Sequence, residues 1–200
     1  MWNKTTDLSK VKYINRRKSM TKSQKNKILK HLDKIKDKIK NGEKSHFTIE
    51  ENDVYYTVDG IEGYNFPLET LKEITSELPE SKDSHTISKT FNDVWSYGKP
   101  VRVNVKDFLI ELKKHYKELS DNIGKSNADK SVYIINIRGT NHIYNLKRLI
   151  NVLEFFGNDT KMYVSDNARS VMMFISDVGG MVLMPAICKD KVMKVNLTLD

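Results

Sequence analysis

The chain has 200 residues, 38% of them hydrophobic and 30% charged, and a formal net charge of +8 at pH 7. A chain of this length can bury one good core, or one domain with an appendage. Its single cysteine, Cys188, excludes an internal disulfide bond and a zinc site made of several cysteines.

The positive charge is concentrated in the first 45 residues. They hold 13 lysines and two arginines against four acidic residues, a net charge of +11, whereas the remaining 155 residues have a net charge of −3. Such a basic segment attracts phosphate backbones without reading their sequence, although a solvated, solubilising helix has the same composition. Arginine is limited there to Arg16 and Arg17, which argues against an element that reads bases.

Membrane segments are not expected. No stretch approaches the roughly 20 apolar residues that a membrane-spanning helix needs, and the first residues lack the apolar core of a signal peptide. We therefore expect a soluble, cytoplasmic protein with no membrane partner.

The first predicted element is a lysine-rich helix. Thr21–Gln24 fits a capping box, and Asn41-Gly42 supplies a stop. Between them an apolar stripe recurs at helical spacing, made of Ile28, Leu32, Ile35 and Ile39. A stripe this narrow suits docking on one neighbour, so we expect residues 1–44 to form a basic, partly helical arm outside the core.

From residue 45 onward the pattern predicts alternating strands and helices. Residues 46–50 and 54–58 indicate a hairpin. A short extended stretch followed by an amphipathic helix of roughly three turns then recurs. This unit covers residues 64–78, 101–119 and 143–156.

The polar segments 79–88 and 121–130 are predicted to be loops. Three short strands follow the third helix, separated by turns at 166–167 and 177–180. They cover Lys161–Ser165, Val171–Ser176 and Met181–Pro185, and residues 192–199 alternate like one more strand.

In its order of elements and in four short motifs, the segment 142–186 resembles the closing half of the last domain of a bacterial sliding clamp, the beta subunit of DNA polymerase III. The motifs are Tyr144-Asn145-Leu146, Met162–Asp166, Ser170–Ile175 and Met181–Ala186. The resemblance implies an α+β, DNA-clamp-like domain over residues 45–190, in which strand-helix-strand repeats pack helices on antiparallel sheet. Residues 191–200 then form a C-terminal tail.

The resemblance also implies a non-enzymatic, DNA-associated accessory factor of replication or transcription, such as a processivity factor or loading platform, of the kind that a phage or plasmid carries. Its partner would be double-stranded DNA, bound without sequence preference. Clamps close into rings, so a second copy of this chain is an alternative partner, in a homo-oligomer. The DNA-binding candidates are the lysines of the first helix and cations on the helices that line the hole in clamps: Lys22, Lys25, Lys27, Lys30, Lys34, Lys36, Lys38, Lys40, Lys113, Lys114, Lys117, Lys147 and Arg148.

In clamps, the strand that matches residues 182–186 forms one wall of an apolar pocket. That pocket captures short peptides of polymerase and repair proteins. The positions carried over are Val182, Met184, Pro185 and Ala186. Ala186 replaces a larger methionine, and the tail that follows is a candidate cover for the pocket. The alternative is an ordinary buried edge of the core.

No catalytic or metal-binding motif stands out. The chain lacks a Gly-rich phosphate loop and the H-E-x-x-H, G-x-S-x-G and C-x-x-C motifs, and its five histidines have no ligand spacing. We expect no catalytic residue, metal or cofactor. Two alternatives remain: a protein-interaction module that binds or mimics replication machinery, and a nucleic-acid-processing enzyme without a visible motif.

Overall fold

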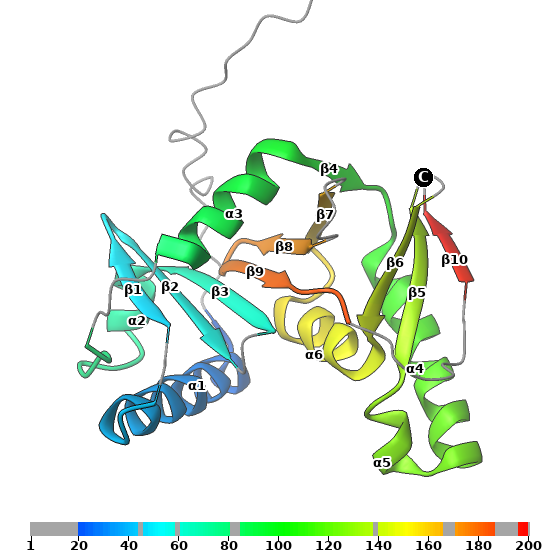
Figure 1. Ribbon diagram of the computed structural model, residues 1–200, viewed down its shortest axis with the longest axis horizontal. Coiled ribbons are helices and arrows are strands. Elements are labelled where there is room, and N and C mark those ends of the chain that lie inside the picture. Colours follow the sequence, from blue (N-terminus) through cyan, green and yellow to red (C-terminus); the bar gives the residue numbers. More distant parts are fainter. Residues whose placement is uncertain are drawn as a thin grey trace, which may run out of the picture.

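The computed structural model describes residues 20–43, 46–58, 61–80, 85–137, 140–165, 171–186 and 196–199. Within these ranges the chain forms two β-sheets and several helices, so the predicted α+β class is confirmed (Figure 1). None of the described helices is both long enough and apolar enough to cross a membrane.

The larger sheet has seven strands, and every neighbouring pair is antiparallel. Their order is β1 (Phe47–Glu50), β2 (Asp53–Val58), β3 (Glu62–Pro67), β9 (Gly179–Leu183), β8 (Met172–Ser176), β7 (Lys161–Ser165) and β4 (Gly98–Val101). The smaller sheet has three strands, in the order β10 (Asn196–Leu199), β5 (Val132–Ile137) and β6 (Thr140–Asn145). β5 is antiparallel to β6 and parallel to β10.

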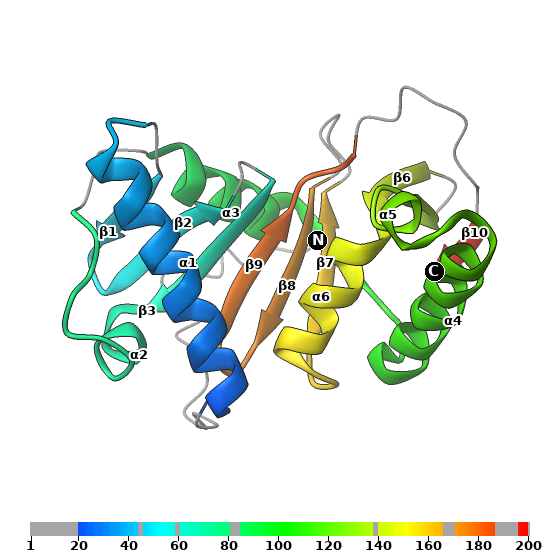
Figure 2. The same cartoon turned by 90° about the horizontal axis from the view of Figure 1, so that it is seen from below.

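Three long helices lie side by side along one side of the molecule, as Figure 2 shows from below. They are α1 (Lys22–Lys40), α6 (Leu146–Phe156) and α4 (Val105–Ile123). On the other side, α3 (His85–Tyr97) crosses the opposite face of the larger sheet. The two remaining helices, α2 (Leu68–Lys72) and α5 (Lys125–Ala128), are short.

Helix α1 has the predicted bounds. Thr21 and Gln24 form the capping box, with the Gln24 side chain accepting from the Thr21 amide at 2.8 Å, and the chain leaves the helix at Gly42, whose φ is +72°. Its apolar stripe does not lie outside the core, however. Leu32 and its neighbours on this stripe belong to the same buried cluster as the aromatic side chains of β2 and β3. Helix α1 packs on those rings and shields them from water.

The predicted strand-helix unit is present at all three places, although the first, β3 and α2, has a short helix. The second and third copies are interlocked. β4 precedes α4 and β6 precedes α6. β4 pairs with β7, the strand after α6, and β6 pairs with β5, the next strand after α4. Each of these helices therefore joins a strand of one sheet to a strand of the other.

The hairpin and the strands predicted after the third helix are confirmed, but several ends are shifted. β4 covers Gly98–Val101 where the extended stretch was expected to begin at residue 101, and β9 ends at Leu183 where the strand was expected to reach Pro185. Phe47 lies opposite Tyr56 in the β1–β2 hairpin. β9 begins at Gly179, two residues before the predicted strand, because the turn after β8 uses only two residues. Gly179 packs so closely under Phe66 that a Cβ atom there would clash with the ring.

Four predictions of local structure are wrong or incomplete. The helix expected up to residue 78 ends at Lys72, and the Thr75 hydroxyl accepts from the Glu77 amide at 3.1 Å, a local bond that competes with a continuing helix. The segment predicted as a loop over 79–88 contains the start of α3, and the other loop contains α5. Strand β5 was not predicted from the sequence.

Helix α3 packs on the larger sheet above Gly180. Because Gly180 has no side chain, it leaves room for the Phe91 ring.

Candidate functional site

Helices α1, α6 and α4 form one surface, which we call the helical layer. Polar contacts hold it together. Between α1 and α6, the Gln24 side chain donates to the Phe155 carbonyl at 2.5 Å, and the Lys27 ammonium lies 5.1 Å from the centre of the Phe155 ring. Between α4 and α6, Lys113 pairs with Glu154 at 2.8 Å. Helix α1, which carries these charged side chains, is therefore held by contacts with the larger sheet and with α6.

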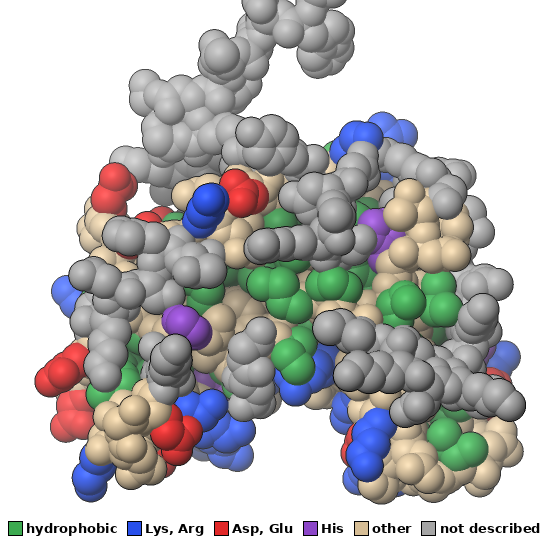
Figure 3. Space-filling model, in the orientation of Figure 1, with side chains coloured by type: hydrophobic (Ala, Val, Ile, Leu, Met, Phe, Trp, Pro, Cys, Tyr) green, Lys and Arg blue, Asp and Glu red, His purple; other side chains and the backbone are tan. Residues whose placement is uncertain are grey.

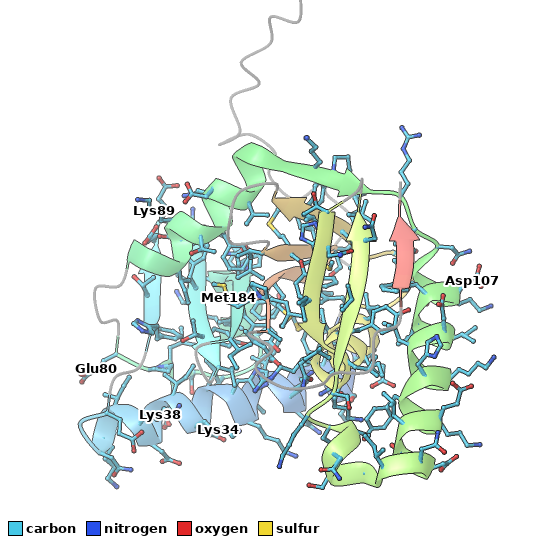
Figure 4. The ribbon with its side chains drawn as sticks, turned by 45° about the vertical axis from the view of Figure 1, so that its right-hand side comes forward. Lys34, Lys38, Glu80, Lys89, Asp107 and Met184 are labelled. Atoms are coloured by element: carbon cyan, nitrogen blue, oxygen red, sulfur yellow. The ribbon has the colours of Figure 1, made fainter. Side chains whose placement is uncertain are left out.

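Most of the predicted DNA-binding cations lie on the helical layer. Along α1 the exposed lysines are Lys22, Lys30, Lys34 and Lys40, and the half-buried ones are Lys25, Lys27, Lys36 and Lys38. Figure 4 labels Lys34 and Lys38 on α1, on the side of the molecule opposite Lys89 of α3. On α4 and α6 the side chains of Lys113, Lys114 and Lys117 are exposed and those of Lys147 and Arg148 are half-buried.

Charge is distributed unequally over the layer. α1 carries eight lysines against Asp33 and Asp37, whereas four acidic residues offset the four lysines of α4. Figure 3 shows lysine and arginine side chains along the lower edge of the molecule, together with acidic ones at the lower left, where α1 runs. The net positive charge of the layer therefore comes from α1.

Several of the predicted cations already have partners. Lys36 lies 3.5 Å from Glu77. Burial lowers the pKa of the Lys27 ammonium, although Glu62 and Glu154 act to raise it. The Lys147 ammonium lies 4.7 Å from the centre of the Tyr116 ring. Lys114 and Lys117 of α4 are also exposed, but α4 has as many acidic residues as lysines. The exposed lysines of α1 are therefore the strongest candidates for contacts with an anionic ligand.

Arg148 is not part of that outer surface. Its guanidinium donates to Glu62 Oε1 at 2.9 Å, and the Tyr64 hydroxyl donates to Glu62 Oε2 at 2.8 Å. Glu62 is only 8% exposed. Burial, and then the charge of Glu62, raises the pKa of Tyr64 well above its usual value, and the same two causes act on the buried Tyr56. The sequence gives no local signal for this network, since its members come from β2, β3 and α6.

Arg148 lines a groove of about 800 Å³ between the start of α6, the end of β9 and the residues that follow β9. Its wall is partly apolar and partly basic, and it is formed by Ile61, Glu62, Asp129, Lys130, Val132, Asn145, Lys147, Arg148, Asn151, Leu183, Met184, Pro185 and Ala186. Figure 3 shows a hollow at the lower edge between the two halves of the molecule, with basic side chains beside it.

Three of the four predicted peptide-binding residues line this groove. Met184, Pro185 and Ala186 are half-buried, and Figure 4 shows Met184 between β3 and the smaller sheet. The Met184 amide donates to the Ile61 carbonyl at 3.0 Å and the Ala186 amide to the Ile143 carbonyl at 2.7 Å. These two bonds fix the segment against both sheets.

The prediction for Val182 is wrong. Successive residues of a strand point to opposite faces of the sheet, so Val182 points away from the face of Leu183. It is fully buried beneath Phe91 and its neighbours on α3. Val182 therefore belongs to the core under α3, a helix that was not predicted from the sequence.

The described part of the predicted tail forms a strand at the edge of the smaller sheet. Residues 196–199 form β10 along the edge of β5. Residues 187–195, which include Cys188, lie outside the described residues, as do Arg16 and Arg17. Among the described side chains, no three His, Cys, Asp or Glu residues come together as a metal site.

Comparison of the chain with protein-family models, with curated proteins and with solved structures found no match.

Proposed function

We propose that this protein is a non-enzymatic, DNA-associated accessory factor of replication or transcription that binds double-stranded DNA without sequence preference. The observation that carries this proposal is the placement of eight lysines on α1, a helix packed on the sheet and beside α6. A row of lysines on a fixed helix suits a repeating phosphate backbone. Because the helix is already packed, the protein backbone does not have to be ordered when DNA binds.

Lysine contacts to phosphates position a protein on DNA but do not read bases. Each neutralised phosphate releases a counterion, so affinity should fall steeply as salt rises. If the four exposed lysines of α1 each contact one phosphate, the slope of log K against log salt is about −4.

The resemblance to a sliding-clamp domain also supports this proposal. The interlocked units β4-α4-β5 and β6-α6-β7 place α4 and α6 together, with strands of both sheets behind them. The resemblance implies that helices of such units face DNA. A ring around DNA would require several copies related by closed symmetry.

Exchange of two lysines tests the proposal. Lys30 and Lys34 are both exposed on α1, one turn apart. The double variant Lys30→Gln, Lys34→Gln should lower the affinity for duplex DNA by about tenfold near 0.1 M salt, because two phosphate contacts are lost. Fluorescence anisotropy with a labelled duplex measures this.

The matched control is Lys89→Gln, Lys161→Gln, which removes the same charge from α3 and β7, where both lysines are also exposed. It should leave the affinity nearly unchanged. Equal losses in the two double variants would mean that net charge, and not the row on α1, controls binding.

The groove favours a second candidate function, a module that binds a short peptide of a replication or transcription protein. A flexible methionine next to a rigid proline forms an adaptable apolar wall, and Lys130 at the same groove is exposed. Met184→Lys should abolish capture of a peptide with aliphatic and aromatic anchors. Because Met184 is only half-buried, the melting temperature should change little.

Titration calorimetry with such a peptide measures the binding, and a thermal melt checks the fold. Unchanged binding by the folded Met184→Lys variant would exclude this groove as the peptide site. No arrangement of the described side chains favours a nucleic-acid-processing enzyme over these two functions.

A further inference from the structure

Strand β10 completes the edge of the smaller sheet. It pairs in parallel with β5, with Asn196 opposite Ile134 and Leu199 opposite Ile137. Figure 1 shows it as the outermost strand beside β5. Its backbone therefore occupies a row of hydrogen-bonding groups on β5 that would otherwise have no strand beside it.

The edge of β5 is unusually receptive to another strand. Residues 132–137 read Val-Tyr-Ile-Ile-Asn-Ile, without a charged residue, glycine or proline. Such a segment has the composition that pairs with other chains when its edge is open. The edges of the larger sheet differ, since β4 carries Lys99 and Pro100, and β1 is short and ends at Glu50. Charge, proline and short length all discourage pairing.

β10 itself is weakly anchored through its backbone. Its pairing covers four residues, and parallel pairing is somewhat weaker per residue than antiparallel pairing. β10 pairs with no described strand other than β5. The nine residues 187–195 connect it to the segment after β9, and a stretch of that length spans up to about 30 Å when extended. β10 can therefore separate from β5 without disturbing another strand pair.

We propose that the β5 edge is a strand-acceptor site that is filled by β10 of the same chain or, in an exchanged dimer, by β10 of a second copy. A second copy is the partner that fits, because its β10 supplies the same four residues in the same register and no new surface is needed. Exchange of identical elements is a low-cost route to a symmetric dimer. This inference rests on the sheet edges and is independent of DNA binding.

Cross-linking between single-cysteine variants tests the exchange. Asn136 and Thr198 lie opposite one another in the β5–β10 register. In a Cys188→Ser background, one protein carries Asn136→Cys and another carries Thr198→Cys. The two are mixed at high concentration and treated with a short bismaleimide, which joins thiols that are close together. Exchange predicts a covalent dimer that increases with protein concentration.

Two controls make the result decisive. The variant with both cysteines in one chain should give a cross-linked monomer at low concentration, which tests the β5–β10 pairing itself. A mixture of Asn136→Cys with Lys161→Cys, an exposed position on β7, measures random collisions. A mixture that yields no more dimer than this control overturns the exchange, and a double variant that forms no cross-linked monomer overturns the pairing.

Removal of β10 provides a second measurement. A chain that ends at Val195 and carries Asn136→Cys has an empty acceptor site, so it should cross-link to full-length Thr198→Cys protein several-fold faster than the full-length acceptor does. If circular dichroism shows that the shortened chain does not fold, the full-length mixture decides the question alone. A folded shortened acceptor that reacts no faster contradicts the proposal.

Discussion

Glu62 is a buried carboxylate whose two oxygens have different partners. One accepts from Arg148 on α6 and the other from Tyr64 on the same strand. The Arg148 side chain is 27% exposed, so its ion pair with Glu62 is shielded from water more than a surface pair is. Arg148 therefore acts as a link between the larger sheet and α6 at the wall of the groove.

Loss of this link should be measurable. Arg148→Ala leaves Glu62 buried without its cationic partner, which should lower the free energy of unfolding by about 1–3 kcal/mol. Urea denaturation measures this change. Lys114→Ala, at an exposed position of α4, is the control and should have no measurable effect. Equal stability of the two variants would mean that the ion pair contributes nothing.

Residues in the groove show why the site was only partly predictable. Met184 and Pro185 could be selected from the sequence because they follow a strand in a short recognisable motif. Glu62 and Lys130 are far from them along the chain and give no local signal. Val182 was assigned to the wrong face because its burial depends on α3, which was not predicted.

At the level of elements, helices with clear end signals were predicted correctly. α6 has Asn145 at its N-cap, whose side chain accepts from the Arg148 amide at 2.9 Å, and it ends at Gly157, whose φ is +80°. α3 was missed although Ile87, Phe91 and Val94 recur at helical spacing, because polar residues precede it and resemble a loop. The pairing of β4 with β7 depends on the tertiary fold and has no counterpart in local sequence.

Helix α1 is both part of the core and the main carrier of positive charge, whereas the sequence pattern predicts a charged arm outside the core. Its apolar stripe is part of the core, and its lysines give the helical layer its charge. Deletion of residues 1–44 would therefore remove part of the core together with the cations. Substitution of single lysines separates the two roles better.

The structural role of α1 can be measured directly. Leu32 is 1% exposed, so Leu32→Ala should lower the free energy of unfolding by about 2–5 kcal/mol. Asn26→Ala, at an exposed position of the same helix, should have no measurable effect. Chemical denaturation followed by circular dichroism gives both values. A stable Leu32→Ala variant would mean that α1 does not contribute to the core.

At the scale of the whole molecule, different helices cover the two sides. One side carries α1, α6 and α4, and α3 crosses the opposite face of the larger sheet. The first 45 residues have a net charge of +11, and the rest of the chain has a net charge of −3. Eight of the 13 lysines in the first 45 residues lie on α1, in the helical layer. An extended anion such as duplex DNA would therefore meet an attractive surface mainly along α1.

The salt dependence of duplex binding tests this account most directly. Binding constants are measured between low and moderate salt for several DNA duplexes whose sequences are unrelated to one another. The natural chain is compared with the double variant Lys30→Gln, Lys34→Gln. We predict similar affinities for all sequences and a linear fall of log K with log salt, and in the double variant a slope smaller by about two. An identical slope in both proteins, or binding that does not respond to salt, would contradict the proposal that the lysines of α1 hold the DNA backbone.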